Sequence, residues 1–196
     1  MEILGLEKLE NGHLFFLDEK KLKKEILQRN FLIKDLTITK VYPDKLKITI
    51  NLRKPFAYLS DSRVYYTLSE EGIILKKNTD VRNLPIIQLE QESISNKTGH
   101  RVDGFIVSTI QLLQGFQKQK IDTDKIILNR NDETIRFNIL DSTQVLLSLT
   151  KDNQFVPPSL QIIISRFRIE GSVPASIDFR FEKPIITLKN GDKYTP

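Results

Sequence analysis

Residues 31–59, FLIKDLTITKVYPDKLKITINLRKPFAYL, predict a β-hairpin. Apolar and polar side chains alternate over 36–39 and again over 46–53, on either side of a break at Tyr42-Pro43-Asp44-Lys45. A period of two is typical of strands with one buried face and one wet face. The proline presets φ for a turn and the aspartate can bond its own backbone, so a tight connection is favoured. We therefore expect two antiparallel strands joined at residues 42–45.

Alternation also predicts which side chains of the second strand are buried. Ile48 and Ile50 share the apolar face of the hairpin and are expected in the core. Lys47 and Thr49 lie on the opposite, exposed face, where they form a candidate second docking surface.

The composition is that of a globular protein richer in strands than in helices. The 196 residues are 39% hydrophobic and 28% charged, and residues that favour strands are abundant. This length suits one large domain or two small ones. No apolar run is long enough to span a membrane and no signal-peptide pattern begins the chain. Because residues 2–6 look like the middle of an amphipathic helix, we expect any anchor or signal to lie upstream.

The net charge of +5 is concentrated near the start of the chain. Residues 1–59 hold 12 Lys and Arg against 8 Asp and Glu, whereas residues 60–196 hold 18 against 17. The basic part, with Lys20, Lys21, Lys23 and Lys24 on one predicted helix, suits anionic lipid, an acidic partner or nucleic acid. A solvated lysine face is an equally good interpretation. No exposed aromatic residues are interleaved with these lysines, so we do not expect a nucleic-acid partner.

The sequence offers little for catalysis. It has no cysteine and only two histidines, His13 and His100, which stand on an apolar connector and a polar loop. No nucleophile elbow, phosphate loop or dinucleotide glycine pattern occurs. The acidic pairs stand at turn signals, where solvated side chains are the simpler interpretation. We therefore expect a binding module without metal or cofactor, and not an enzyme.

The elements predicted along the chain indicate an α+β fold. Short apolar spacings predict a helix over 2–10, and Asp18 is a candidate N-cap for a helix that ends near Asn30. Pro55 marks an edge or the change from one sheet to the next. Beyond it, periodicity predicts strands over 64–68, 73–75, 84–89, 126–128, 134–140, 144–149, 175–181 and 185–188, with helices over 103–118 and 157–168.

Several short motifs, in order along nearly the whole chain, resemble the FtsQ/DivIB family of bacterial cell-division proteins. The hairpin resembles the family's POTRA hairpin at Tyr42-Pro43-Asp44-Lys45-Leu46 and at its Pro55-Phe56-Ala57 exit. Phe15–Asp18 and Phe31–Lys34 follow the family's order upstream, and Tyr66, Glu71-Gly72 and Leu84-Pro85 follow it downstream. Ile177–Phe181 resembles its Asp-Leu-Arg-aromatic strand.

The resemblance implies two domains. Residues 1–55 would be a small POTRA-like helix–hairpin domain whose first strand is missing. Residues 56–190 would be a larger, mixed, strand-dominated β domain with two helices, and residues 191–196 a frayed tail. The resemblance also implies a single-pass protein of the bacterial cell membrane, with this chain on the periplasmic, extracytoplasmic side. It would serve as a non-catalytic scaffold of the divisome that binds the subunits FtsB and FtsL.

In this family FtsB pairs with the edge formed by the last strands, main chain to main chain. By motif, Arg180 and Phe181 occupy the family's arginine and aromatic contact positions, and Lys183 follows them. Ile185, Ile186 and Thr187 would form the strand that offers backbone groups. Phe181 has a second interpretation, because Ile177, Phe179 and Phe181 alternate and would then all face the core.

The chain departs from the family pattern at Phe181, where a tyrosine is usual, and at Lys183-Pro184, where small residues are frequent. An alternative function is a POTRA-type chaperone or docking module of an outer-membrane assembly or secretion system, although no tandem repeat or following barrel is apparent. A basic binder of nucleic acid or cell-wall polysaccharide is a third class. A peptidoglycan enzyme has the least support.

Overall fold

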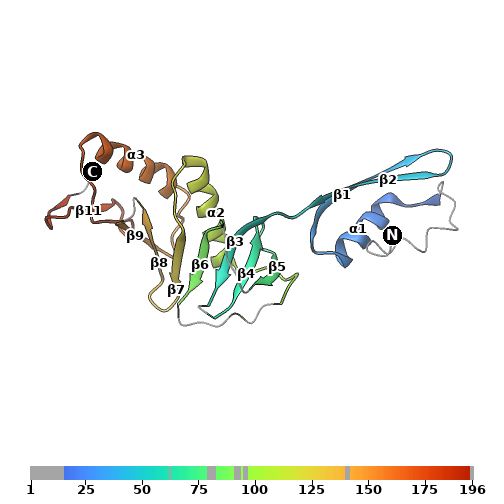
Figure 1. Ribbon diagram of the computed structural model, residues 1–196, viewed down its shortest axis with the longest axis horizontal. Helices are drawn as coiled ribbons and strands as arrows, with labels where there is room; N and C mark the ends of the chain where they lie inside the picture. Colours follow the sequence, from blue (N-terminus) through green and yellow to red (C-terminus); the bar gives the residue numbers. More distant parts are fainter. Residues whose placement is uncertain are drawn as a thin grey trace. The chain divides into compact units, whose positions relative to one another are not determined.

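The computed structural model describes residues 16–61, 63–78, 83–90, 94, 97–139 and 142–194. The chain divides into two compact units, Met1–Pro55 and Phe56–Pro196, here called the N-terminal and C-terminal units. The helix predicted over 2–10 lies outside the described residues. Figure 1 shows each unit with its own sheet.

The N-terminal unit contains the predicted helix and hairpin. Helix α1 spans Glu19–Arg29, and the Asp18 carboxylate accepts hydrogen bonds from the backbone N–H groups of Lys20 and Lys21, as an N-cap should. Strands β1 (Ile33–Val41) and β2 (Lys45–Leu52) pair antiparallel, with Ile38 opposite Ile48. The hairpin prediction is confirmed.

Burial in this hairpin is uneven, which corrects one prediction. Helix α1 packs on β1, so Leu36 is 1% exposed while its cross-strand neighbour Ile50 is 38% exposed. Ile48 is only half-buried, and Leu52 is exposed. The apolar pattern of β2 correctly gives its face, but the expectation that Ile50 belongs to the core is wrong. Alternation defines which side a residue points to, not whether another element covers it.

The C-terminal unit is built on one mixed sheet of ten strands among the described residues. The strands lie in the order β12-β11-β10-β9-β8-β7-β6-β3-β4-β5. Their bounds are β3 Pro55–Ser60, β4 Tyr65–Ser69, β5 Ile74–Asn78, β6 Ile86–Leu89, β7 Lys125–Asn129, β8 Thr134–Ile139, β9 Thr143–Ser148, β10 Ser176–Asp178, β11 Ile185–Thr187 and β12 Lys193–Tyr194. Together with the helices, this confirms the predicted α+β class.

Helices α2 (Gly104–Gln119) and α3 (Val156–Ile169) cover the same face of this sheet (Figure 1). Their inner faces join the strands in one apolar core, in which the rings of Phe116 and Phe137 lie 5.0 Å apart. The helices approach each other closely at Gly115, where a Cβ atom would lie 2.6 Å from Cγ of Pro157. A residue with a Cβ atom would therefore clash at this helix crossing unless α3 shifted.

The junction between the units holds an element that the sequence did not predict. Residues 55–60 were expected to be an exit segment, but they form β3, an interior strand parallel to β6. Pro55 is the first residue of β3, a position where its missing N–H is tolerated. Phe56, Ala57 and Leu59 are buried in the core. The change of sheet predicted at Pro55 is confirmed.

Candidate functional site

The candidate partner site lies where the sheet ends in β10, β11 and β12. Strand β11 pairs antiparallel with β10 on one side and with β12 on the other. Gly191 adopts a φ of 92°, which lets the chain turn back after Leu188 and place Lys193 opposite Thr187. The segment expected to be a frayed tail thus contributes β12, a strand of two residues, as the outermost strand of the sheet.

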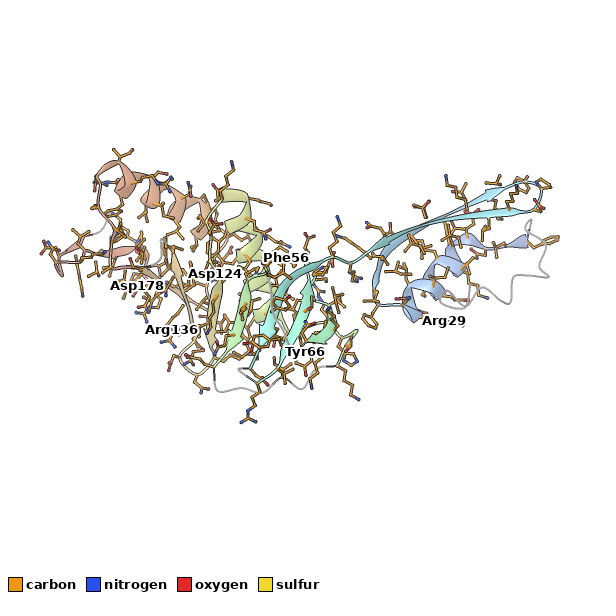
Figure 2. The ribbon with its side chains drawn as sticks, in the orientation of Figure 1. Arg29, Phe56, Tyr66, Asp124, Arg136 and Asp178 are labelled. Atoms are coloured by element: carbon orange, nitrogen blue, oxygen red, sulfur yellow. The ribbon has the colours of Figure 1, made fainter. Side chains whose placement is uncertain are left out.

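Arg180 is held by Asp178. Its Nη2 atom lies 2.6 Å from Oδ2 of Asp178 and its Nε atom donates to both carboxylate oxygens. Burial of the Asp178 carboxyl favours its neutral form, but the hydrogen bonds from the side chain and backbone N–H of Arg180 outweigh this and lower the pKa of Asp178. The same bond raises the pKa of Arg180. Figure 2 labels Asp178 at this end of the unit.

Phe181 lies outside the regular strand. Strand β10 ends at Asp178, three residues before the predicted end, because the Asp178 carboxylate accepts the N–H of Arg180 and turns the chain. Ile177 is fully buried and Phe179 packs on the core, but the alternation does not continue, and Phe181 is 55% exposed. The core interpretation of Phe181 is therefore wrong. Lys183 is exposed as well.

The predicted strand residues Ile185, Ile186 and Thr187 are those of β11. Ile186 is buried in the core, whereas Ile185 and Thr187 are half-buried on the opposite face. The carbonyl of Thr187 accepts the N–H of Ala175, and the N–H of Leu188 donates to Asp192. Backbone groups alternate in direction along a strand. The backbone N–H and C=O groups of Thr187 therefore point toward β10. The backbone groups of its neighbours Ile186 and Leu188 point the other way, toward β12.

Charged side chains of the C-terminal unit also gather away from the sheet edge. A groove of about 790 Å³ is lined by Glu90, Asp124, Arg136 and Arg168 among others, and Figure 2 labels two of them, Asp124 and Arg136. Glu90 and Arg136 form an ion pair at 2.5 Å. Among the described residues no group of His, Cys, Asp or Glu could hold a metal ion.

The lysine face of α1 is exposed but partly neutralised. Lys23 forms an ion pair with Asp35 at 2.7 Å, whose hydrogen bond lowers the pKa of Asp35. Lys20, Lys21 and Lys24 remain on the outer surface of the helix. Within the described part of the chain, no helix is long and apolar enough to cross a membrane.

Two surface features of the C-terminal unit were missed from the sequence. One is β12, because a segment of Gly, Asp and Lys carries no strand signal. The other is the outer face of α3, where Phe155, Ile162 and Ile169 are all strongly exposed. Their spacing of seven is visible in the sequence, but the inner face of the same helix accounted for its apolar pattern.

Comparison with known proteins identifies the first part of the chain. Residues 1–51 match the family described as POTRA domain, FtsQ-type. This range contains α1, β1 and nearly all of β2.

Related proteins carry one name, cell division protein DivIB. That of Clostridium botulinum (strain Hall) is 24% identical over 139 residues, which cover 70% of this chain and 51% of the relative. That of Bacillus subtilis is 40% identical over 76 residues, 38% of this chain and 28% of the relative. The chain thus spans about half the length of the clostridial relative and less of the Bacillus one.

Among solved structures, the major extracytoplasmic domain of DivIB from Geobacillus stearothermophilus aligns with a TM-score of 0.38 and 16% identity, covering 63% of this chain and 98% of that one. The POTRA match and the DivIB relatives agree with the motifs found along the sequence. Residues 1–51 thus match an FtsQ-type POTRA domain, and the chain is similar to the DivIB proteins of bacterial cell division.

Proposed function

We propose that this chain is the extracytoplasmic part of a non-catalytic divisome scaffold, held at the bacterial cell membrane by an anchor outside the sequence. Similarity to DivIB proteins supports a role in cell division, and the sheet edge at β12, the outermost strand among the described residues, is the observation that supports partner binding. An edge strand presents unpaired N–H and C=O groups to which another chain can add. The proposed partners are FtsB, through this edge, and FtsL with it.

The partner strand would pair with the outer side of β12 or replace this strand of two residues on β11. In the first case the donor is the backbone N–H of Lys193. The backbone N–H and C=O of Tyr194 point toward Ile186 on β11, so those of the neighbouring Lys193 point away from the sheet. In the second case the outward groups of Ile186 on β11 receive the partner. Ile185 and Thr187 support the strand from the half-buried face.

Side chains beside the edge would give the partner its specificity. Phe181 exposes an aromatic ring that a partner residue can cover. Arg180 is fixed by Asp178 and still 41% exposed, so its guanidinium presents donors in a set orientation. Lys183 adds a charge at the rim. All of these lie between β10 and β11 in the sequence.

The edge is tested by Lys193→Pro with Lys193→Ala as the matched control. Both variants remove the same charge, but only proline removes the N–H. If the partner pairs with the outer side of β12, Lys193→Pro should abolish binding of an extended FtsB peptide in calorimetry, and Lys193→Ala should bind like the original chain. Equal affinity of the two variants would reject strand addition at β12, and a strong loss in both would indicate a charge contact instead.

Phe181→Ala tests the side-chain contact separately. If the partner covers the exposed half of this ring, affinity falls by about tenfold, from the apolar area that no longer leaves water. Because Phe181 is already 55% exposed in the free chain, its folding should hardly change, which thermal unfolding can verify. An unchanged Kd would remove Phe181 from the interface.

A further inference from the structure

The turn between β11 and β12 carries an Asn-Gly pair, Asn190-Gly191, whose residues are both exposed. Gly191 donates its backbone N–H to the carbonyl of Leu188, and the N–H of Leu188 donates to the carbonyl of Asp192. These two hydrogen bonds close the turn. The place where a Cβ atom of Gly191 would lie is open, with nothing of the described chain within 4 Å. The backbone nitrogen that follows Asn190 is therefore not shielded by a side chain.

An asparagine followed by glycine is chemically labile. The backbone nitrogen of the glycine attacks Cγ of the asparagine and forms a new C–N bond, while the side-chain nitrogen leaves as ammonia and takes the proton of the backbone N–H. Water then adds to the resulting cyclic imide and breaks one of its two C–N bonds, which yields aspartate or isoaspartate. Glycine is the residue that hinders this attack least, because it has no Cβ atom and the freest backbone.

In the folded turn both reacting groups are engaged. The backbone nitrogen of Gly191 lies 3.0 Å from the carbonyl oxygen of Leu188, to which it donates. Oδ1 of Asn190 accepts the N–H of Asp192 at 3.1 Å, and Nδ2 of Asn190 donates to Oδ2 of Asp192 at 2.7 Å. The attack requires the first bond to break and the asparagine side chain to rotate out of the other two. The reaction must therefore start from an opened turn, in which β12, a strand of two residues, has left β11.

We propose that Asn190 is a deamidation site that the pairing of β12 with β11 protects, and that its conversion releases β12 irreversibly. The cyclic imide has no N–H at Gly191, so the hydrogen bond to Leu188 is lost as soon as the ring forms. In isoaspartate the main chain then runs through Cβ and Cγ of residue 190. This extra methylene lengthens a turn that places Lys193 opposite Thr187, so the pairing of β12 no longer fits.

The new charge acts in the same direction. In either product a carboxylate replaces the amide of Asn190, whose Nδ2 lies 2.7 Å from Oδ2 of Asp192 in the folded turn. A hydrogen bond is thereby exchanged for a close contact between two carboxylates, which disfavours their charged forms at neutral pH. The aspartate product, which has no extra methylene, should therefore loosen the turn as well, but less than isoaspartate does.

The consequence for the sheet is a change of its outermost strand. Once β12 has left, the backbone groups of Ile186 that point toward Tyr194 face solvent, and β11 becomes the edge. The reaction needs neither a partner nor a membrane, so it stands or falls independently of the proposed function.

The protection by β12 is tested by Tyr194→Pro, with Tyr194→Ala as the matched control. Both variants remove the tyrosine ring, but only proline removes the backbone N–H that points toward Ile186. The chains are incubated at mildly alkaline pH, and peptide mapping by mass spectrometry measures the loss of the Asn190 amide, separately from the other Asn-Gly pair, Asn11-Gly12. We expect Tyr194→Pro to react about fivefold faster than Tyr194→Ala, the effect of one lost backbone hydrogen bond. Equal rates would overturn the protection.

The original chain gives the same test without a variant. Asn190 should lose its amide more slowly in the folded chain than in the same chain unfolded by urea at the same pH, because unfolding breaks all three hydrogen bonds of the turn. Equal rates in the two states would reject a protected site.

The release of β12 is measured on aged chain, after ion exchange has separated the isoaspartate form from fresh chain. The amide of Leu188, which donates to Asp192 in the folded turn, should exchange with solvent about tenfold faster in the isoaspartate form. Asn190→Asp carries the charge without the methylene and should lie between the two. Amides of α2 should be unchanged in all three. A Leu188 amide that stays as protected in the isoaspartate form as in fresh chain would overturn the release.

Discussion

The Asp178 carboxylate determines where β10 ends and where Arg180 points. One oxygen accepts the N–H of Arg180, which turns the chain out of the strand, and both oxygens receive the guanidinium. The carbonyl of Arg180 in turn accepts a hydrogen bond from Lys151 at 2.7 Å. The paired side chains of Asp178 and Arg180 therefore fix the position of the chain just before Phe181, the second candidate contact residue.

Asp178→Asn should lower stability most at neutral pH. The folded-state pKa of Asp178 is lowered, so its ion pair contributes above the ordinary pKa of an aspartate and is lost as pH falls through the folded value. We expect a loss of about 0.5–1 kcal/mol at pH 7, reduced for solvent screening, and a smaller loss near pH 2. Urea unfolding at both pH values measures this difference, with exposed Asp122→Asn as control. A loss that is the same at both pH values would contradict the prediction.

Asp18→Ala should destabilise α1 by about 1 kcal/mol, because two N–H groups of the first turn lose their acceptor. Asp18→Asn keeps an acceptor oxygen and should stay close to the original chain. Hydrogen exchange of residues 19–29 reports the change locally. If alanine and asparagine behave alike, the cap contributes by charge and not by its hydrogen bonds.

The helices show how much of an element can be predicted from sequence. For α1, the N-cap Asp18 and the apolar spacing of Leu22 and Ile26 predict both ends to within a residue. Strand β3 was missed because Pro55 suggested an exit, and its interior place depends on pairing with β6, whose Ile86 lies opposite Tyr58 although it follows 28 residues later in the chain. Pairings between distant segments leave no local periodicity.

The candidate site was predictable to a similar extent. The motif correctly locates β11 and an exposed arginine. However, the end of β10 depends on one hydrogen bond of Asp178, and the place of β12 outside β11 depends on the turn at Gly191. Neither is an apolar pattern. Exposure was the hardest property to predict: Ile50 and Phe181 are exposed because no element in the described part of the chain covers them.

Gly115→Ala should destabilise the C-terminal unit although alanine favours helices. The propensity gain is about 1 kcal/mol. Against it, the new Cβ would lie 2.6 Å from the rigid ring of Pro157, and overpacking of this kind costs about 1–3 kcal/mol. We expect a lower melting temperature in calorimetry. Gly104→Ala at the start of α2 has nothing within 4 Å and serves as control. A rise in melting temperature with Gly115→Ala would mean that α3 moves aside easily.

At the scale of the whole molecule, the chain is two units with separate cores. The N-terminal core is a cluster of five buried residues around Leu36, whereas the core of the C-terminal unit runs through both helices and most of the sheet. A small core contributes little stability. The units should therefore respond separately to core mutations.

Leu36→Ala should destabilise the N-terminal unit by about 2–5 kcal/mol, because a fully buried leucine leaves a cavity. Amide exchange should accelerate in α1, β1 and β2 and stay unchanged in α2. Ile50→Ala, at a 38% exposed position on the same face, should have a much smaller effect. Faster exchange in α2 would show that the two units fold as one.

The C-terminal unit begins on an interior strand and ends on an edge strand, so tension along the chain would load its two ends differently. The N-terminal unit is joined to β3 by only Arg53 and Lys54. Force entering there acts in shear on the parallel pairing of β3 with β6, whose backbone bonds must break together. At the other end, β12 can unzip from β11 one pair at a time. In a pulling experiment we expect β12 to leave at low force and β3 to hold until the sheet fails. We therefore expect the unit to resist force on the side of the POTRA domain and to release its last strand easily at the edge proposed for the partner.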